Sequence, residues 1–176
     1  DKVQPYLEQG GLHAFLDIYT GAHKSNEQYQ ELMELGLRRI SLGVESGCEA
    51  LLEFVQKPGT REEIVRVVTA LKTAGLAVVV ILMVGLGGER YRRAHLRDTV
   101  SLVRSLPLDR GDIVYLSQFD PTPAAPYRSI AEAEKIVPLS PADLRDEVRS
   151  WKTLLDRELG GCGIKIAPYS FQRFLY

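Results

Sequence analysis

The chain has 176 residues, two cysteines and a formal net charge of −1, which suits one globular domain that can bury a hydrophobic core without disulfide bonds. The near-zero charge argues against a general binder of nucleic acid, and the longest apolar run, at residues 76–86, is too short to span a membrane. We expect no signal peptide, because the first residues are polar, and the low cysteine content indicates a reducing, cytoplasmic compartment. Because the chain opens at Asp1 rather than at a methionine, we expect it to be part of a longer protein.

Predicted strands and helices alternate along the chain. Short apolar runs that end in glycine or polar residues indicate strands, whereas apolar residues spaced three or four apart indicate helices. Two helices are expected to begin in capping boxes, at Ser25 and Thr60, where the hydroxyl oxygen accepts a backbone amide hydrogen and the side chain three residues later reaches back. The predicted order is a strand at 13–19, a helix at 25–35, a strand at 40–44, helices at 49–55 and 60–74, a strand at 77–84, a helix at 94–106, a strand at 113–116 and a helix at 140–159.

The strand at 77–84 is apolar at every position, which predicts burial on both faces, as in a parallel sheet. Helix-to-strand junctions recur at Gly36, Gly75 and Gly111, at intervals of about 35 to 40 residues, which is the length of one βα unit. We therefore predict an α/β fold with a parallel sheet of about four βα units. These residues leave two architectures open, a doubly wound sheet and part of a β/α barrel.

Ligands of parallel α/β folds bind at the carboxyl ends of the strands, where this chain places polar residues after apolar runs. Glu45 directly follows a predicted strand and could accept hydrogen bonds from the two hydroxyls of a ribose, or it could balance the dipole of the helix that follows. Asp17 has the same two interpretations at the end of the first strand. Lys57 could bind a carboxylate of a ligand or be an ordinary solvated lysine.

Other motifs carry less information. The loop Gly85–Gly88 allows close approach of backbone to a ligand, but it is neither a Walker A loop nor a dinucleotide fingerprint. The basic segment 89–95 suits a solvated loop better than a phosphate contact. The three histidines lack metal-ligand spacing, and Cys48 suits a small buried residue better than a reactive thiol.

Two segments resemble the core of radical S-adenosylmethionine (radical SAM) enzymes, in the group that contains oxygen-independent coproporphyrinogen oxidase and the Elongator catalytic subunit. Residues 35–47 are similar to the fourth strand of that family, and residues 80–89 are similar to its fifth strand and glycine-rich loop. Within them, Ile81 and Gly87 replace residues that are usual in the family. The proline-rich segment 120–123 resembles the loop after strand six.

The resemblance implies a partial (β/α)6 TIM-like barrel, of which this chain would supply strands three to six. We expect the barrel part to span residues 1–128, and a C-terminal helical extension with an aromatic tail to span residues 129–176. By the same resemblance, Glu45 would hold the ribose hydroxyls of S-adenosylmethionine, and Lys57 with Ser46 would pair with its carboxylate. The remaining implied contacts are Asp17 near the amino-acid end of the cofactor, and Gly85, Gln118 and Phe119 along its adenine.

The family binds a [4Fe–4S] cluster through three thiolates in a C-x-x-x-C-x-x-C motif. Neither Cys48 nor Cys162 belongs to such a motif, so we expect the cluster ligands upstream of Asp1. The implied activity is reductive cleavage of S-adenosylmethionine to a 5′-deoxyadenosyl radical that abstracts hydrogen from a substrate, with a reductant for the cluster as partner. This chain alone is expected to be inactive. Its residues do not identify the substrate, and they indicate neither a membrane nor a nucleic-acid partner.

Two other functions remain open. The chain could be a non-catalytic βα scaffold that recruits a partner through an exposed aromatic tail at Phe171, Phe174 and Tyr176. It could also be an unrelated β/α enzyme that uses Asp17 and Glu45 as acid and base. That function requires both carboxyl groups to reach one substrate.

Overall fold

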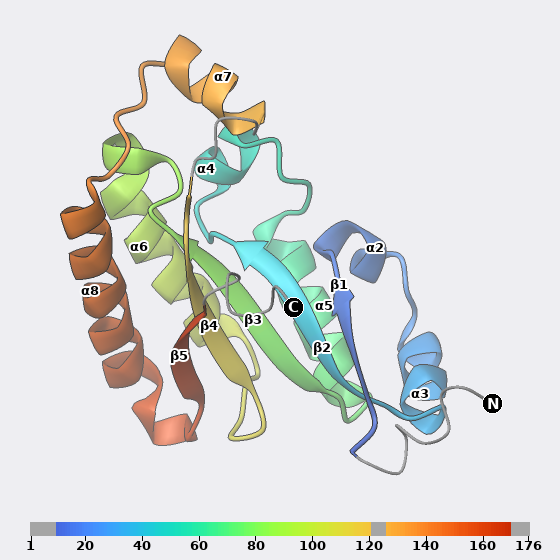
Figure 1. Ribbon diagram of the computed structural model, residues 1–176. Helices are drawn as coiled ribbons and strands as arrows, with labels where there is room; N and C mark the ends of the chain where they lie inside the picture. Colours follow the sequence, from blue (N-terminus) through green and yellow to red (C-terminus); the bar gives the residue numbers. More distant parts are fainter. Residues whose placement is uncertain (1–9, 121–125, 170–176) are drawn as a thin grey trace.

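The sheet has five parallel strands that lie side by side in the order in which they occur along the chain (Figure 1). The computed structural model describes residues 10–120 and 126–169. A doubly wound sheet reverses its strand order at the ligand-binding edge, so the unbroken order instead matches the wall of a β/α barrel. The strands are β1 (Leu12–Leu16), β2 (Leu37–Glu45), β3 (Ala77–Val84), β4 (Ile113–Gln118) and β5 (Lys165–Tyr169).

The long helices that connect the strands cover one face of the sheet (Figure 1). A right-handed crossover between neighbouring parallel strands carries its helix to the same face each time, as long as the strand order advances in one direction. Within residues 10–120 and 126–169, the opposite face of the sheet is therefore left without such helices. The helices are α2 (Ile18–Ala22), α3 (Asn26–Glu34), α4 (Glu49–Phe54), α5 (Arg61–Thr73), α6 (Gly88–Ser105), α7 (Pro126–Ala133), α8 (Pro141–Leu159) and the 3₁₀ turn η1 (Gly160–Cys162).

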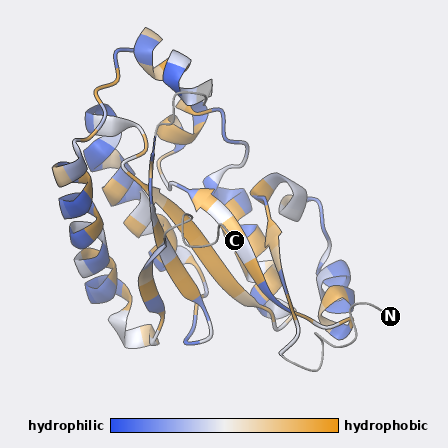
Figure 2. Ribbon diagram, in the orientation of Figure 1, coloured by the Kyte–Doolittle hydropathy of each residue, from blue (hydrophilic) through white to orange (hydrophobic). Residues whose placement is uncertain are grey.

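The hydrophobic core lies between the sheet and these helices. Alternate residues of β3, from Val78 to Val84, point into this core because side chains alternate between the two faces of a strand. In Figure 2, hydrophobic residues run along β2 and β3, whereas much of α8 is hydrophilic. The sequence predicts that β3 is buried on both faces. On the face that points away from the helices, Val79 is buried, whereas Ile81 and Met83 are partly exposed, so the prediction is confirmed there only at Val79.

Both predicted capping boxes are present. The Ser25 hydroxyl oxygen accepts from the amide of Gln28 at 3.3 Å, and the Gln28 side chain accepts from the amide of Ser25 at 2.9 Å. Thr60 and Glu63 repeat this exchange at the start of α5. The predicted α/β fold with a parallel sheet, as part of a TIM-like barrel, is confirmed as well.

Several elements differ from the sequence-based expectation, among them α7, which is absent from the predicted set, and β2, which begins at Leu37 instead of Ile40. β1 ends at Leu16 because Asp17 caps α2, so residues 18–22 are helical instead of continuing the strand. α6 begins at Gly88 instead of near residue 94, which places the basic segment 89–95 on a helix and not in a loop. β5 is absent from the predicted set, because a five-residue edge strand that contains a proline gives a weak sequence signal.

The C-terminal part of the chain joins the sheet that precedes it. α8 packs on β3 and β4, and β5 pairs with β4, whereas the sequence predicts only a helix and an aromatic tail in residues 129–176. The proline-rich loop at 121–125 and the aromatic tail at 170–176 lie outside the described residues. Within the part of the chain that the structure describes, every helix is too short or too polar to cross a membrane.

Candidate functional site

Four of the predicted site residues lie at the carboxyl edge of the sheet. Glu45 ends β2 and Gln118 ends β4, while Asp17 and Gly85 directly follow β1 and β3. Parallel strands bring their carboxyl ends to one edge, so positions far apart along the chain meet there. Lys57 joins this group from the loop after α4, since its Nζ lies 3.2 Å from Oε1 of Glu45.

The backbone of Glu45 is strained. Its φ is +61°, in the left-handed region that residues with a β-carbon rarely adopt. The amide of Ser46 donates to the carbonyl oxygen of Val44 at 2.7 Å, which closes a three-residue turn centred on Glu45. The pairing of β2 with β3 also shifts register between Gly43 and Glu45. Strained residues and bulges cluster at functional sites, and here they fix the direction of one carboxylate.

The carboxylate of Glu45 is mostly buried and only half satisfied. Its side chain is 16% exposed, and Oε1 accepts from Lys57. The other oxygen, Oε2, is buried without a hydrogen-bond partner among the described residues. Gly43 gives this group room, because a β-carbon at that position would lie 2.7 Å from Oε1. Since buried polar atoms normally have partners, Oε2 is an acceptor that suits a ligand hydroxyl.

Lys57 reaches Glu45 because the chain reverses directly after α4. Gln56 adopts a φ of +55°, and the amide of Lys57 donates to the carbonyl oxygen of Leu52 at 2.9 Å. The Lys57 side chain is 28% exposed, and an ammonium group carries three hydrogen-bond donors. It can therefore hold Glu45 and bind an anionic group that arrives from solvent.

Asp17 caps a helix. As the N-cap of α2, it accepts from the Thr20 amide at 2.8 Å through Oδ1 and from the Thr20 hydroxyl at 2.7 Å through Oδ2. These hydrogen bonds, with a smaller contribution from the charge of Lys57, lower the pKa of Asp17. Because both oxygens hold the start of the helix, the position of Asp17 near the amino-acid end of a cofactor stays a prediction.

Ser46 differs most from its predicted role. It is fully buried, and its Oγ lies 2.8 Å from Nδ1 of His95 and accepts from the amide of Cys48 at 2.9 Å. The hydroxyl is thus engaged inside the protein, and the burial of Ser46 continues the alternation of the buried residues Leu42 and Val44 along β2. This placement does not suit the expected contact of Ser46 with a ligand carboxylate.

The remaining predicted residues lie beyond β3 and β4. Gly85 has a φ of +89°, which favours glycine, and a β-carbon there would also lie 2.5 Å from Cδ1 of Leu144. The ring of Phe119 packs edge-on against Tyr127 at a centroid distance of 4.6 Å. Gln118 is exposed. Their contact with an adenine stays a prediction.

Two residues that the sequence analysis does not identify as part of the site support its edge from α6. His95 and Thr99 are buried on this helix and contact the turn that follows Glu45. Their spacing of four residues places them on the helix face that also carries the buried apolar residues. A polar pair on such a face indicates an internal hydrogen-bond network. Metal-ligand spacing among the histidines is a different criterion and does not identify this pair.

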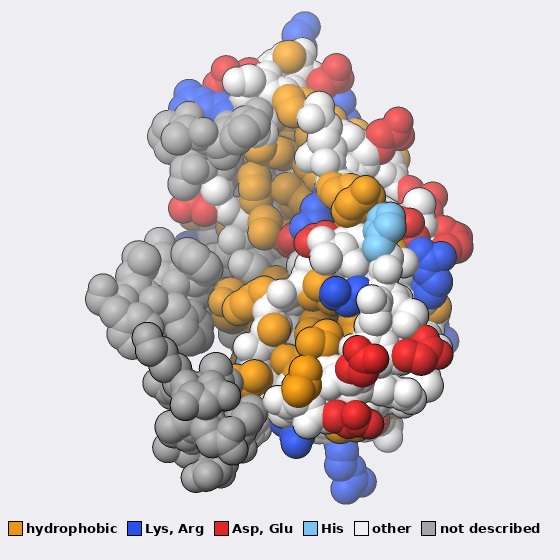
Figure 3. Space-filling view, turned by 90° about the vertical axis from the view of Figure 1, so that its right-hand side faces the viewer, with side chains coloured by type: hydrophobic (Ala, Val, Ile, Leu, Met, Phe, Trp, Pro, Cys, Tyr) orange, Lys and Arg blue, Asp and Glu red, His pale blue; other side chains and the backbone are white. Residues whose placement is uncertain are grey.

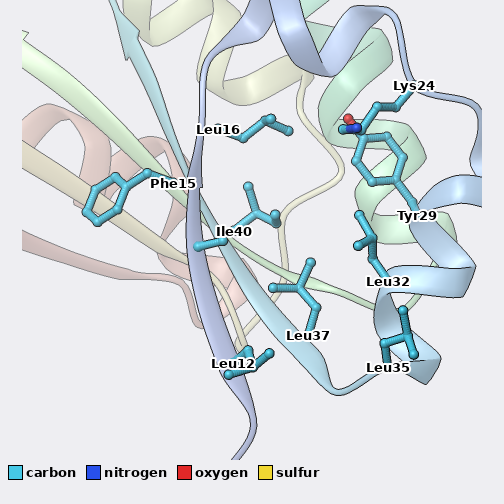
Figure 4. Close-up of a pocket in the computed structure, with 10 residues that line it drawn as sticks. Leu12, Phe15, Leu16, Lys24, Tyr29, Leu32, Leu35, Leu37 and Ile40 are labelled. Carbon is cyan, nitrogen blue, oxygen red and sulfur yellow. The ribbon is translucent and has the colours of Figure 1, made fainter. Parts of the chain in front are cut away.

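A separate pocket of about 330 Å³ lies between β1 and α3 (Figure 4). Its lining is apolar apart from Lys24 and the hydroxyl of Tyr29, and the site residues described above are not part of it. Figure 3, which views the molecule from the side of β1 and α3, shows exposed hydrophobic side chains among charged ones there. This pocket offers few groups for catalysis or for binding a polar cofactor.

The cysteines of this chain do not fit an iron–sulfur cluster. There are two in the sequence, and both are free, with Cys48 buried and Cys162 exposed. Among the residues that the structure describes, no three side chains of the metal-binding types come together. A cluster held by three thiolates therefore needs ligands from elsewhere.

A known family and several solved structures resemble this chain. Residues 10–103 match the family model described as the Radical SAM superfamily. No curated protein matches the sequence. Among solved structures, Elp3 from the archaeon Methanocaldococcus infernus, with its N-terminus deleted, has a TM-score of 0.63 at 14% identity, over 89% of this chain and 34% of that one. This chain thus spans about a third of that structure, and at this identity the likeness shows the fold alone.

A second solved structure gives a weaker match. A xylose isomerase domain protein from Planctomyces limnophilus has a TM-score of 0.43 at 14% identity, over 91% of this chain and 54% of that one. A score this low carries no argument about fold or function.

Proposed function

This chain belongs to the radical SAM superfamily, and we propose that the carboxyl edge of its sheet binds S-adenosylmethionine as part of a longer radical enzyme. The observation that carries the proposal is the buried Oε2 of Glu45, which has no partner among the described residues. Membership of this family also argues against an unrelated β/α enzyme that uses Asp17 and Glu45 as acid and base.

Glu45 is the group that we assign to the ribose. A ribose presents two neighbouring hydroxyls, and a carboxylate at the end of a buried strand can accept a hydrogen bond from each. Oε1 is already in contact with the ammonium of Lys57, and Oε2 is buried, so a ligand hydroxyl would satisfy the open acceptor. Gly43 supports this assignment because its missing side chain leaves space beside the carboxylate.

Lys57 is the group that we assign to the carboxylate of S-adenosylmethionine. Its ammonium is partly exposed, and it is paired with a partly buried acid at 3.2 Å. The charge of Lys57 also contributes to the lowered pKa of Asp17, after the hydrogen bonds from Thr20, so the ammonium lies within electrostatic reach of the end of β1. A cation that contacts one acid and lies within electrostatic reach of the other can bind the carboxylate of a zwitterionic amino-acid group, with Asp17 on its ammonium side.

The chemistry of the family needs more than this chain supplies. When bound at a reduced [4Fe–4S] cluster, S-adenosylmethionine supplies a 5′-deoxyadenosyl radical that removes hydrogen from a substrate. We propose that the cluster ligands, and the contact with a reductant, belong to another part of the protein. The residues described here would bind and orient the nucleoside and amino-acid ends of the cofactor.

Calorimetric titration of the chain with S-adenosylmethionine tests the proposal. We expect the unchanged chain to bind, and we expect Glu45→Ala to bind at least about tenfold more weakly, because it removes both acceptors for the ribose hydroxyls. Glu49→Ala is the matched control, since Glu49 is an exposed acid in the first turn of the next helix.

The outcomes separate clearly. Binding that is lost in Glu45→Ala and kept in Glu49→Ala supports the proposed site. A chain that does not bind S-adenosylmethionine, or that binds it equally well after Glu45→Ala, contradicts the proposal.

A further inference from the structure

Each of the three residues that follow Glu45 is held in place by a hydrogen bond that involves a side chain. Ser46 Oγ lies 2.8 Å from Nδ1 of His95, and the amide of Gly47 donates to Oγ1 of Thr99 at 2.8 Å. The amide of Cys48 donates to Oγ of Ser46 at 2.9 Å. Two of these anchors come from adjacent turns of one helix, α6, so a single rigid element holds the whole turn.

The directions of these hydrogen bonds follow from His95. Its Nε2 lies 2.9 Å from the carbonyl oxygen of Met83 at the end of β3, and a carbonyl can only accept, so Nε2 carries the ring hydrogen. Nδ1 is then an acceptor, and two hydroxyls reach it, that of Ser46 at 2.8 Å and that of Thr99 at 3.3 Å. The nearer hydroxyl, that of Ser46, donates to it. Burial lowers the pKa of His95 to about 4, so the ring stays neutral near pH 7 and this arrangement persists. His95 thereby links the ends of β2 and β3.

Gly47 lets the turn lie directly on α6. A β-carbon at this position would lie 2.5 Å from the carbonyl oxygen of Asp98 and 2.7 Å from Cα of Thr99. Such contacts with helix backbone cannot be relieved by moving a flexible side chain. The turn and the helix are therefore fitted to each other at the backbone, and the hydrogen bonds of His95 and Thr99 act across this contact.

The strained residue of the site lies immediately before this anchored turn. Glu45 has a φ of +61°, and the hydrogen bond from the amide of Ser46 to Val44 spans it. A residue with a side chain leaves this region unless its surroundings hold it there. β2 holds the residues before Glu45, and α6 holds the residues after it.

We propose that His95 and Thr99 are positioning residues, which act through Ser46 and Gly47 to hold Glu45 in the conformation that presents its carboxylate to the ligand. Both are buried, with exposed fractions of 2% and 0%, so they act on the ligand through the groups that they hold and not by direct contact. The inference rests on the proposed function, because it concerns how the carboxylate assigned to the ribose is held. It also gives the buried hydroxyl of Ser46 a role inside the protein.

Three variants and one control test the proposal in the chain as it stands. Thr99→Val removes the hydroxyl and keeps the shape of the side chain, whereas Thr99→Ser restores the hydroxyl. Ser46→Ala removes the link to His95. Thr69→Val is the control, because the Thr69 hydroxyl donates to a backbone carbonyl of its own helix at an exposed position. Thermal unfolding followed by circular dichroism shows which variants are folded at the temperature of the titrations.

The decisive measurement is a double-mutant cycle on the affinity for S-adenosylmethionine. We expect Thr99→Val and Ser46→Ala each to weaken binding by about threefold to tenfold, with Thr99→Ser and Thr69→Val close to the unchanged chain. In the Glu45→Ala background, we expect Thr99→Val to have no further effect, because its influence passes through the missing carboxylate. A loss that is equal in both backgrounds overturns the proposal.

Hydrogen exchange at single amides supplies a second readout. We expect the amides of Ser46 and Cys48 to exchange faster in Thr99→Val than in Thr99→Ser, because the turn loosens when its anchor is removed. Faster exchange with unchanged affinity makes the residues merely structural and overturns the proposal. Absence of binding by the unchanged chain contradicts the proposed function and this inference together, whereas additive losses contradict this inference alone.

Discussion

Gly43 and the carboxylate of Glu45 occupy one small space. A β-carbon on Gly43 would lie 2.7 Å from Oε1 of Glu45 and 3.4 Å from Nζ of Lys57. These two residues lie on the same strand, two positions apart, so their side chains share a face of the sheet. The glycine is therefore part of the site, because it determines where the carboxylate can rest.

This relationship predicts that Gly43→Ala weakens the binding of S-adenosylmethionine with little loss of stability. The added methyl group must displace the ends of two flexible side chains and not the backbone, so we expect a change of at most about 1 kcal/mol in the free energy of unfolding. We expect the affinity to fall by about tenfold or more, because the carboxylate moves out of its position. Chemical denaturation and calorimetric titration measure the two effects.

Gly160→Ala is the matched control for that substitution. A β-carbon at Gly160 meets no atom within 4 Å among the described residues, and its φ of −57° suits any residue. We expect this variant to bind like the unchanged chain. Equal affinities for Gly43→Ala and Gly160→Ala would contradict the role assigned to Gly43.

Most of the fold can be predicted from the sequence where one physical signal dominates. β3 spans the same residues as the predicted strand, 77–84, because an unbroken apolar run has few other structures available. The boundary after β1 is wrong because Ile18 and Tyr19 are apolar, yet the cap that Asp17 provides makes them helical. β5 escapes prediction because its partner, β4, lies far away in the sequence, and local patterns do not report such pairing.

The site can be predicted less completely. The position of Glu45 at the end of a buried strand marks it as a candidate, and the structure brings Lys57 to it. The inward orientation of Ser46 continues the alternation of the buried residues Leu42 and Val44. The sequence-based assignment differs because it rests on the family resemblance and not on this pattern. The part played by His95 depends on a contact between α6 and the end of β2, which no local pattern encodes.

The assignment of Lys57 predicts selective effects on ligands. Lys57→Met keeps much of the aliphatic stem but removes the charge, so we expect weaker binding of S-adenosylmethionine by about tenfold. We expect a smaller effect on adenosine, which has the same ribose and no carboxylate. Titration with both ligands measures the difference. Equal losses for the two ligands would place the ammonium elsewhere than at the amino-acid end.

The burial of His95 predicts a dependence of stability on pH. Its pKa falls from 6.5 to about 4 on folding, so between these values the unfolded chain binds a proton that the folded chain does not. The free energy of unfolding is therefore highest above about pH 6.5. It falls as the pH decreases toward about 4, by at most about 3 kcal/mol. Denaturation across this range measures the loss, and His95→Gln should abolish that part of the slope.

The carboxylates contribute in a different range of pH. Hydrogen bonds from Thr20 lower the pKa of Asp17 from 3.8, and the hydrogen bond from Arg97 lowers the pKa of Asp98 from the same value. A lowered carboxyl pKa gives stabilisation that is present above the unfolded value and lost as the pH falls through the folded one. These losses occur below about pH 4, so they do not mask the histidine. If the free energy of unfolding of His95→Gln falls between pH 6.5 and 4 as steeply as that of the unchanged chain, His95 is not the cause of this dependence.

The position of Asp112 predicts that a substitution can lower the stability of the chain without changing its affinity for S-adenosylmethionine. It lies before β4, at the amino edge of the sheet, where the buried Oδ1 accepts from the amide of Val78 at 2.6 Å and Oδ2 lies 2.8 Å from Nζ of Lys72. We expect Asp112→Ala to lower the free energy of unfolding by about 2–4 kcal/mol, because it leaves the buried amide of Val78 without a partner and removes one of the two carboxylates that pair with Lys72. The affinity of the folded chain for S-adenosylmethionine should not change, since ligands of this fold bind at the opposite edge. Denaturation and calorimetry on the same preparation measure both quantities, and a loss of affinity in the folded variant would show that the two edges are coupled.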